Sequence, residues 1–235
     1  MCRKAMELGL IEVGFSEHVD FDPVDQGFGF FDYDRYVEDI ERARELFRNT
    51  LIVRKGVEID YQRCYEERIR EWLQDKKFDF TIGSVHYLNH KMIGPELAAT
   101  GDLRGIYRSY FTEVRYSVES GLFDVVGHLD LVGRRVAGSS HGAEEISYRE
   151  NMKQILQEIA EQKMYLEINS KGMKEAYADT MPSREMISEY IESGGELVSV
   201  GSDAHCTEEL GSGINDILDF LANRKRCIKL LFEQD

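Results

Sequence analysis

Histidine and carboxylate side chains recur at the ends of short apolar segments of this chain. Four of its six histidines occupy such positions, namely His18, His86, His128 and His205. Two acidic residues occupy comparable positions: Glu58 follows Val57, and Asp203 lies two residues before His205. Imidazole and carboxylate are the side chains that bind divalent cations such as Zn²⁺, Mn²⁺ and Fe²⁺. The pattern predicts a metal site, provided that the fold brings these segments together.

The alternative is that these histidines are structural. A single histidine at the end of a strand is more often a hydrogen-bonded structural residue than a metal ligand. Four histidines and two carboxylates on one face are harder to explain in that way, because charged groups that converge in a cavity need a counter-charge. His90 and His141 lie in polar loop segments, and we interpret both as surface residues.

The segments that carry the candidate ligands are predicted to be strands. Short runs rich in Val and Ile alternate with segments whose apolar residues follow a helical period. The predicted strands cover residues 11–18, 52–60, 78–87, 123–131, 164–170 and 197–205. Helices are predicted between them: one begins near Asp32, another ends near Gly121, and a third lies between Ser183 and Gly194.

This order of about six β-α units predicts an α/β fold with parallel strands and helices packed outside them. A barrel and an open doubly wound sheet both fit the order. We favour the barrel, because the carboxyl ends of all its strands lie on one face, where loops gather the active site. Residues far apart in the sequence would then meet around one cavity.

The first residues of the chain look like the end of a helix. Ala5, Met6 and Leu8 are followed by Gly9, a residue typical of the position just after a helix. One explanation is that an earlier strand and half a helix precede Met1. The other is a short N-terminal helix that closes the floor of the barrel, and the pattern favours neither.

Length and composition limit the class of protein. A chain of 235 residues with 3 Pro and no evident linker predicts one domain, residues 1–235. No segment approaches the ~18 consecutive apolar residues of a membrane span, and no signal peptide is evident. Four cysteines without CxxC spacing predict reduced thiols and a cytoplasmic location: Cys2, Cys64, Cys206 and Cys227.

The net charge of -15 bears on the choice of partner. Phosphate-backbone binding relies on clustered Lys and Arg, so we expect no nucleic-acid partner, and no membrane partner either. A small anionic substrate is compatible with this charge if bound metal ions neutralise it locally. The sequence addresses neither the oligomeric state nor the identity of the metal.

Five strings, found in order along the chain, resemble the motifs of the PHP-domain phosphoesterases. They are Ser16-Glu17-His18, Gly56-Val57-Glu58-Ile59-Asp60, Gly83-Ser84-Val85-His86, Gly127-His128-Leu129-Asp130 and Gly201-Ser202-Asp203-Ala204-His205. A sixth string, followed by Pro182-Ser183, is most similar to the histidinol-phosphate phosphatase branch: Leu166-Glu167-Ile168-Asn169-Ser170-Lys171-Gly172. The resemblance covers nearly the whole chain.

The resemblance implies a distorted (β/α)7 barrel of the PHP type that holds up to three divalent metal ions, of Zn, Mn or Fe. Glu58 would bridge the first and second ions, and His86 and His128 would complete the second. Asp203 would bind the first ion, while His18 and His205 would bind the third. Glu58, Asp203 and His205 would be the catalytic residues among these ligands.

The implied reaction is hydrolysis of a small phosphorylated metabolite, with L-histidinol phosphate, of histidine biosynthesis, the best single choice. The metal ions would hold the phosphate oxygens and activate water. Arg134 matches one phosphate-binding position of the family, and Lys174 matches another at which arginine is usual. Lysine is a point charge that cannot fork onto two oxygens, so substrate binding would be weaker.

One departure from the family concerns its opening strand, which ends in His-x-His. This chain has no such motif, so its barrel would contain about six strands and only the site of Glu58, His86 and His128 would be complete. Either the true start lies roughly 25–40 residues upstream, or the chain is truncated, with fewer metals and little activity. We favour the misplaced start, because loss of an inner strand should cost several kcal/mol.

Two other functions remain open. The missing His-x-His favours a non-catalytic or weakly active barrel that binds metal without turnover. A PHP-type nuclease is the second alternative, and the charge of -15 and the absence of a second domain weigh against it.

Overall fold

The computed structural model describes residues 1–136, 143–175, 177–224 and 228–232. For residues 143–147 it describes the backbone alone. His141 and Cys227, interpreted from the sequence as a surface residue and a reduced thiol, lie outside the described residues. Within the described part of the chain, no helix is long and apolar enough to cross a membrane.

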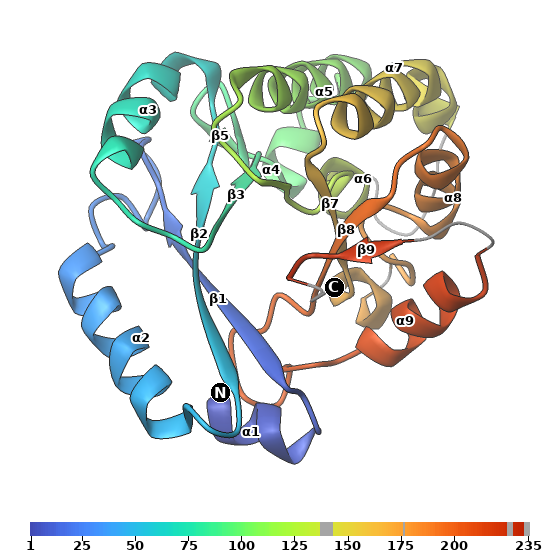
Figure 1. Cartoon of the computed structure of the whole chain (residues 1–235). Coiled ribbons are helices and arrows are strands. Elements are labelled where there is room, and N and C mark those ends of the chain that lie inside the picture. Colours follow the sequence, from blue (N-terminus) through green and yellow to red (C-terminus); the bar gives the residue numbers. More distant parts are fainter. Residues whose placement is uncertain (137–142, 176, 225–227, 233–235) are drawn as a thin grey trace.

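The central feature is a curled sheet of seven parallel strands with the order β1-β2-β3-β6-β7-β8-β9 (Figure 1). The strands are β1 (Glu12–Val19), β2 (Ile52–Asp60), β3 (Phe80–Ser84), β6 (Val125–Val126), β7 (Tyr165–Asn169), β8 (Leu197–Gly201) and β9 (Lys229–Leu230). All six predicted strands are present, and the prediction of an α/β fold with a PHP-type barrel sheet is confirmed. The sequence pattern missed β9 and the hairpin of β4 (Tyr87–Leu88) and β5 (Lys91–Met92), because two-residue strands carry no readable period.

The longer helices lie outside the curled sheet (Figure 1). The longer ones are α2 (Tyr33–Phe47), α3 (Glu66–Gln74), α5 (Leu103–Ser120), α7 (Ala143–Glu161), α8 (Arg184–Glu192) and α9 (Ile214–Ala222). Shorter helical segments are α1 (Cys2–Glu7), α4 (Pro95–Ala98), α6 (Leu131–Val136) and the 3₁₀ turns η1 (Arg63–Tyr65) and η2 (Lys171–Lys174). The predicted helix end before β1 is confirmed as α1.

The helix boundaries follow the capping residues that the sequence indicated. The side chain of Asp32 accepts from Arg35 N at the start of α2, and that of Ser183 accepts from Met186 N at the start of α8. The α5 helix ends at Gly121, whose φ of 63° lies in the left-handed region that glycine adopts without strain. These three predictions are confirmed.

The strands that precede the candidate ligands are shorter than predicted. Both β3 and β6 end before His86 and His128, because buried carboxylates capture the backbone N–H groups that would otherwise continue the sheet. The N–H of His86 donates to Asp60 Oδ1 at 2.6 Å, and that of His128 donates to Glu167 Oε2 at 2.6 Å. Beyond β8, Asp203 leaves the extended conformation with a φ of 47°. His86, His128 and Asp203 therefore lie in loops just after strands, whereas His18 and Glu58 lie near the ends of β1 and β2.

Close packing between β1, β2 and β3 fixes the part of the sheet that carries the site. The buried ring of Phe80 fills the space left by two glycines, Gly14 and Gly56. The hydroxyl of Tyr36, from α2, donates towards the carbonyl oxygens of Phe15 and Gly56, each at 2.9 Å. This side of the sheet thus tolerates little added volume at Gly56.

We predict that Gly56→Ala lowers the free energy of unfolding by about 1–3 kcal/mol. A Cβ at Gly56 would lie 2.2 Å from Phe80 Cζ, so the buried ring would have to move. Urea unfolding of the wild type and the variant measures the loss. Adding Phe80→Leu to Gly56→Ala should recover part of it, and a loss that Phe80→Leu leaves unchanged would show that the ring is not the cause.

Candidate metal centre

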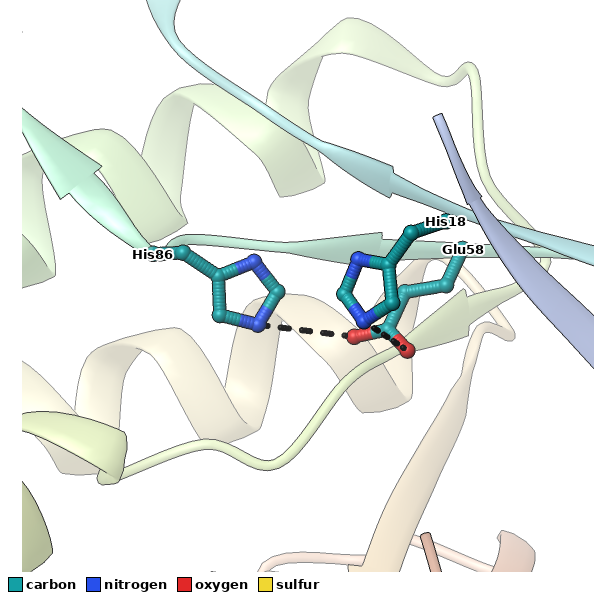
Figure 2. Close-up of side chains that lie close together, drawn as sticks. All are labelled: His18, Glu58 and His86. Atoms are coloured by element: carbon teal, nitrogen blue, oxygen red, sulfur yellow. Dashed lines mark ion pairs between the residues drawn. The ribbon is translucent and has the colours of Figure 1, made fainter. Parts of the chain in front are cut away.

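The register between β1 and β2 creates the first half of the site. These strands pair in parallel with His18 opposite Glu58, so the two side chains leave the sheet on the same side. His18 Nε2 lies 3.5 Å from Glu58 Oε2. His86, just beyond β3, points its Nε2 towards the other oxygen of the same carboxylate at 3.6 Å (Figure 2). One carboxylate is thus shared by two imidazoles from neighbouring segments.

A third imidazole reaches the same carboxylate from beyond β6. His128 Nε2 lies 3.2 Å from Glu58 Oε1 and 3.0 Å from His86 Nε2. Among the described residues, one group of potential ligands has all its ligand atoms within 4.8 Å of one another, and its members are His18, Glu58 and His86. With His128, the structure brings together four of the six residues that the sequence singled out.

The separations between these atoms suit a divalent ion. Ligands placed tetrahedrally about 2.0–2.1 Å from zinc lie about 3.3 Å from one another, and the distances above bracket that value. The two Nε2 atoms of His86 and His128 are a close pair in which at least one ring must carry a proton, since two bare lone pairs would repel. A cation between them would remove that conflict, so the residues fit a metal ion.

Electrostatics favours a charged carboxylate here. Burial alone would raise the pKa of Glu58, but the hydrogen bond from His128 and the positive charges of the three imidazoles lower it well below its ordinary value. Burial lowers the pKa of His128, yet its hydrogen bond to Glu58 and the charge of Glu58 raise it to about 8. A metal ion that binds His128 must therefore displace a proton held more tightly than usual.

Two buried carboxylates support the cluster without belonging to it. Asp60, 1% exposed, accepts the backbone N–H of His86 and also lies 3.3 Å from its Nδ1. A carboxylate at Nδ1 fixes the tautomer whose Nε2 is free to bind metal. Glu167 accepts the backbone N–H of His128, and burial, the main cause, raises the pKa of Glu167 to about 7. The sequence placed both residues at strand ends but gave them no role.

Asp203 and His205 form a separate pair at the end of β8. Nδ1 of His205 lies 3.4 Å from Asp203 Oδ1 and 3.0 Å from the carbonyl oxygen of Asp203. Burial is the largest cause of the raised pKa of Glu167, and the negative charges of Glu58 and Asp203 raise it further. The Asp203–His205 pair therefore lies within electrostatic range of the cluster. The amino group of Lys171, a residue that the sequence left without a role, contacts both members of the pair.

The two predicted phosphate-binding residues differ in their surroundings. Arg134, at the end of α6, is engaged by Glu175 through two hydrogen bonds of 2.5 and 2.6 Å. Lys174 is exposed at the end of η2. Beside Arg134, Arg135 is partly buried, and burial is the main cause of its lowered pKa. Neither predicted role is tested by these contacts, and both stay predictions.

His90, interpreted from the sequence as a surface residue, has a partner. Its side chain is 56% exposed, and its Nδ1 lies 2.7 Å from Oδ2 of Asp22, which is buried. It compensates a buried carboxylate and is not part of the ligand group.

The chain is similar in sequence to several known proteins. A family model described as the PHP domain matches residues 1–171 of this chain. The chain is 33% identical over 180 residues to a probable histidinol-phosphatase of Deinococcus radiodurans, a match that covers 75% of this chain and 66% of that protein, just under two thirds of its length. It is 24% identical over 220 residues to a probable histidinol-phosphatase of Clostridium acetobutylicum, with 92% and 82% covered.

A solved structure has the same fold. The histidinol phosphate phosphatase from Lactococcus lactis, in complex with zinc, L-histidinol and phosphate, superimposes with a TM-score of 0.86 at 21% identity. The superposition covers 98% of this chain and 87% of that one. At this level of identity the similarity establishes the architecture of the sheet and helices.

The cluster predicts that His128→Ala weakens metal binding by at least about tenfold, because it removes an imidazole that faces both Glu58 and His86. Metal content per chain, measured by elemental analysis after dialysis against a weak chelator, reports the loss. His90→Ala is the matched control, since this histidine lies outside the ligand group. Equal metal content in the wild type and His128→Ala would contradict the assignment.

The raised pKa of His128 predicts a pH dependence of stability in the metal-free protein. The folded-state pKa of about 8 lies above the ordinary 6.5, so the stabilisation is complete below pH 6.5 and is lost as the pH rises through 8, a change of about 2 kcal/mol. Urea unfolding at pH 6, 7 and 8.5 measures it. His128→Gln should flatten the decline above pH 7, and an unchanged slope in this variant would assign the effect to another group.

Proposed function

The chain belongs to the PHP domain family, and on this premise we propose that it is a metal-dependent phosphatase that hydrolyses L-histidinol phosphate to L-histidinol and phosphate. One observation carries the proposal: a buried carboxylate, Glu58, faces the Nε2 atoms of three histidines from three different strand ends. The relatives described as histidinol-phosphatases support the choice of substrate. The zinc in the Lactococcus structure supports a divalent ion as cofactor.

The residues that would hold the ion are His18, Glu58, His86 and His128. A divalent ion bound there supplies positive charge to the phosphate oxygens and lowers the pKa of water. Glu58 keeps its negative charge inside the protein, because its pKa lies well below the ordinary value. We include Asp203 and His205 in the site as further ligands and Glu58, Asp203 and His205 as its catalytic residues. Zn, Mn and Fe all suit this ligand set, and up to three ions fit the family pattern.

The phosphate group would meet the basic residues that follow β6 and β7. The Arg134 guanidinium is held in a fixed orientation by Glu175, so a phosphate would have to share it with that carboxylate. Among the described residues, Arg135 has no ion-pair partner, which leaves its charge available to an anion. Lys174 adds a point charge at the surface. These cations offset the acidic net charge of the chain locally and favour a small anionic substrate.

Two alternative functions predict different outcomes. A barrel that binds metal without turnover would keep the ligand cluster but release no phosphate. A PHP-type nuclease would cleave DNA or RNA, and the net charge of -15 disfavours that substrate. The cytoplasmic location predicted from the cysteines stays a prediction.

The direct test is release of inorganic phosphate from L-histidinol phosphate by the metal-loaded protein, with EDTA abolishing it. Glu58→Gln removes the charge shared by three imidazoles and should lower kcat/KM by about 10²–10³-fold. Glu161→Gln, an exposed change at the end of α7, is the matched control and should retain full activity.

Three results would contradict parts of the proposal. No phosphate release by the metal-loaded protein would favour the non-catalytic barrel. Cleavage of single-stranded DNA or RNA, with the monoester left intact, would favour the nuclease. Full activity in Glu58→Gln would be compatible with a phosphatase but would show that its active site lies elsewhere.

A further inference from the structure

The amino group of Lys171 lies against the Asp203–His205 pair. Nζ donates to the carbonyl oxygen of Asp203 at 2.9 Å and lies 3.0 Å from His205 Nδ1. It also lies 3.8 Å from Asp203 Oδ1 and 3.9 Å from Oε2 of Glu209. A single positive charge thus faces two carboxylates, one carbonyl oxygen and one imidazole nitrogen at the end of β8.

The backbone around Lys171 keeps this arrangement in place. Its N–H donates to the side chain of Asn169 at 2.9 Å, and Asn169, 1% exposed, is the last residue of β7. The parallel register places Asn169 beside Gly201, the last residue of β8. The start of the lysine side chain is therefore fixed next to the segment that carries Asp203 and His205.

The contacts of Lys171 are those that a cation shared by Asp203 and His205 would make. In the tautomer of His205 that carries its proton on Nε2, Nδ1 accepts from the ammonium group, so that nitrogen cannot bind a metal ion at the same time. It also neutralises the Asp203 carboxylate, which weakens the attraction for a second cation. A divalent ion bound by Nδ1 of His205 and an oxygen of Asp203 would therefore exclude the ammonium group from its present position.

The cluster around Glu58 is built differently. Among the described residues, the ion-pair partners of Glu58 are histidines alone. A neutral imidazole has a lone pair that can bind a metal ion, whereas a lysine ammonium group has none and only donates hydrogen bonds. The described ion-pair partners of Glu58 thus include no lysine or arginine, whereas the Asp203–His205 pair has the ammonium group of Lys171 beside it.

We propose that Lys171 is a built-in competitor of metal at the Asp203–His205 pair. The first ion binds to the Glu58 cluster, and an ion at the end of β8 binds only after the flexible lysine side chain has moved aside. The inference rests on the proposed function, because it sets the order in which the ions enter the same site. It concerns metal binding alone, so its test does not require turnover.

The experiment is a titration of Zn²⁺ into the metal-stripped full chain without substrate. Binding is measured by calorimetry in the presence of a competing chelator. Lys171→Met removes the charge and keeps a side chain of similar length. The variant should bind the last Zn²⁺ ion at least about tenfold more tightly than the wild type, or should bind one more ion per chain than the wild type does. Lys171→Arg, which keeps the charge, should bind as the wild type does.

Three controls locate the effect. Lys153→Met removes the same charge from an exposed position on α7 and should leave binding unchanged. Adding His205→Ala to Lys171→Met should cancel the gain. Melting curves of the metal-free variants check the fold, and Lys171→Gln provides a second neutral variant if Lys171→Met is unstable.

Equal binding by Lys171→Met, Lys171→Gln and the wild type would overturn the proposal, and so would weaker binding by both neutral variants, which would make Lys171 a support for the pair. A gain that persists without His205 would overturn it as well. A wild type that binds Zn²⁺ but releases no phosphate would instead contradict the proposed function and leave the titration result valid.

Discussion

The site depends on the parallel register that sets His18 beside Glu58. A slip of one residue in this pairing would turn one of the two side chains to the opposite face of the sheet. Glu58 would then lose at least one of the three histidines that compensate its buried charge, which would destabilise the folded chain. Packing two residues before Glu58 supports the same register, because the Phe80 ring fills the space left by Gly14 and Gly56. Packing and ligand geometry are therefore consequences of one strand pairing.

Two buried carboxylates determine where the strands before His86 and His128 end. Asp60 and Glu167 each accept a backbone N–H that would otherwise extend the sheet, and each lies on a strand next to the one that it ends. As a result His86 and His128 leave the sheet at fixed points and turn towards Glu58. Asp60 also lies 3.3 Å from Nδ1 of His86, so it fixes the tautomer of that ring as well as the position of its backbone.

The sequence predicted the fold and four members of the cluster because both follow from local patterns. His18, Glu58, His86 and His128 stand at the ends of apolar runs, and parallel topology then places strand ends on one face. Contacts between distant segments left no such signal. Nothing near Lys171 in the sequence indicates that its amino group lies beside His205, and the pairing of Arg134 with Glu175 depends on how two loops meet. The strand ends were also misjudged, since apolar residues continue past the point at which side chains take over the hydrogen bonds.

The two carboxylates of the site have different partners: Glu58 faces histidines, and Asp203 lies beside a lysine. The central claim is that Glu58 and its histidines bind a divalent ion. Anomalous diffraction at the zinc absorption edge, from crystals of the zinc-loaded protein, tests it most directly. We expect a peak about 2.0–2.2 Å from Nε2 of His86 and His128 and from a carboxylate oxygen of Glu58. Zinc bound elsewhere, with no peak within bonding distance of Glu58, would contradict it.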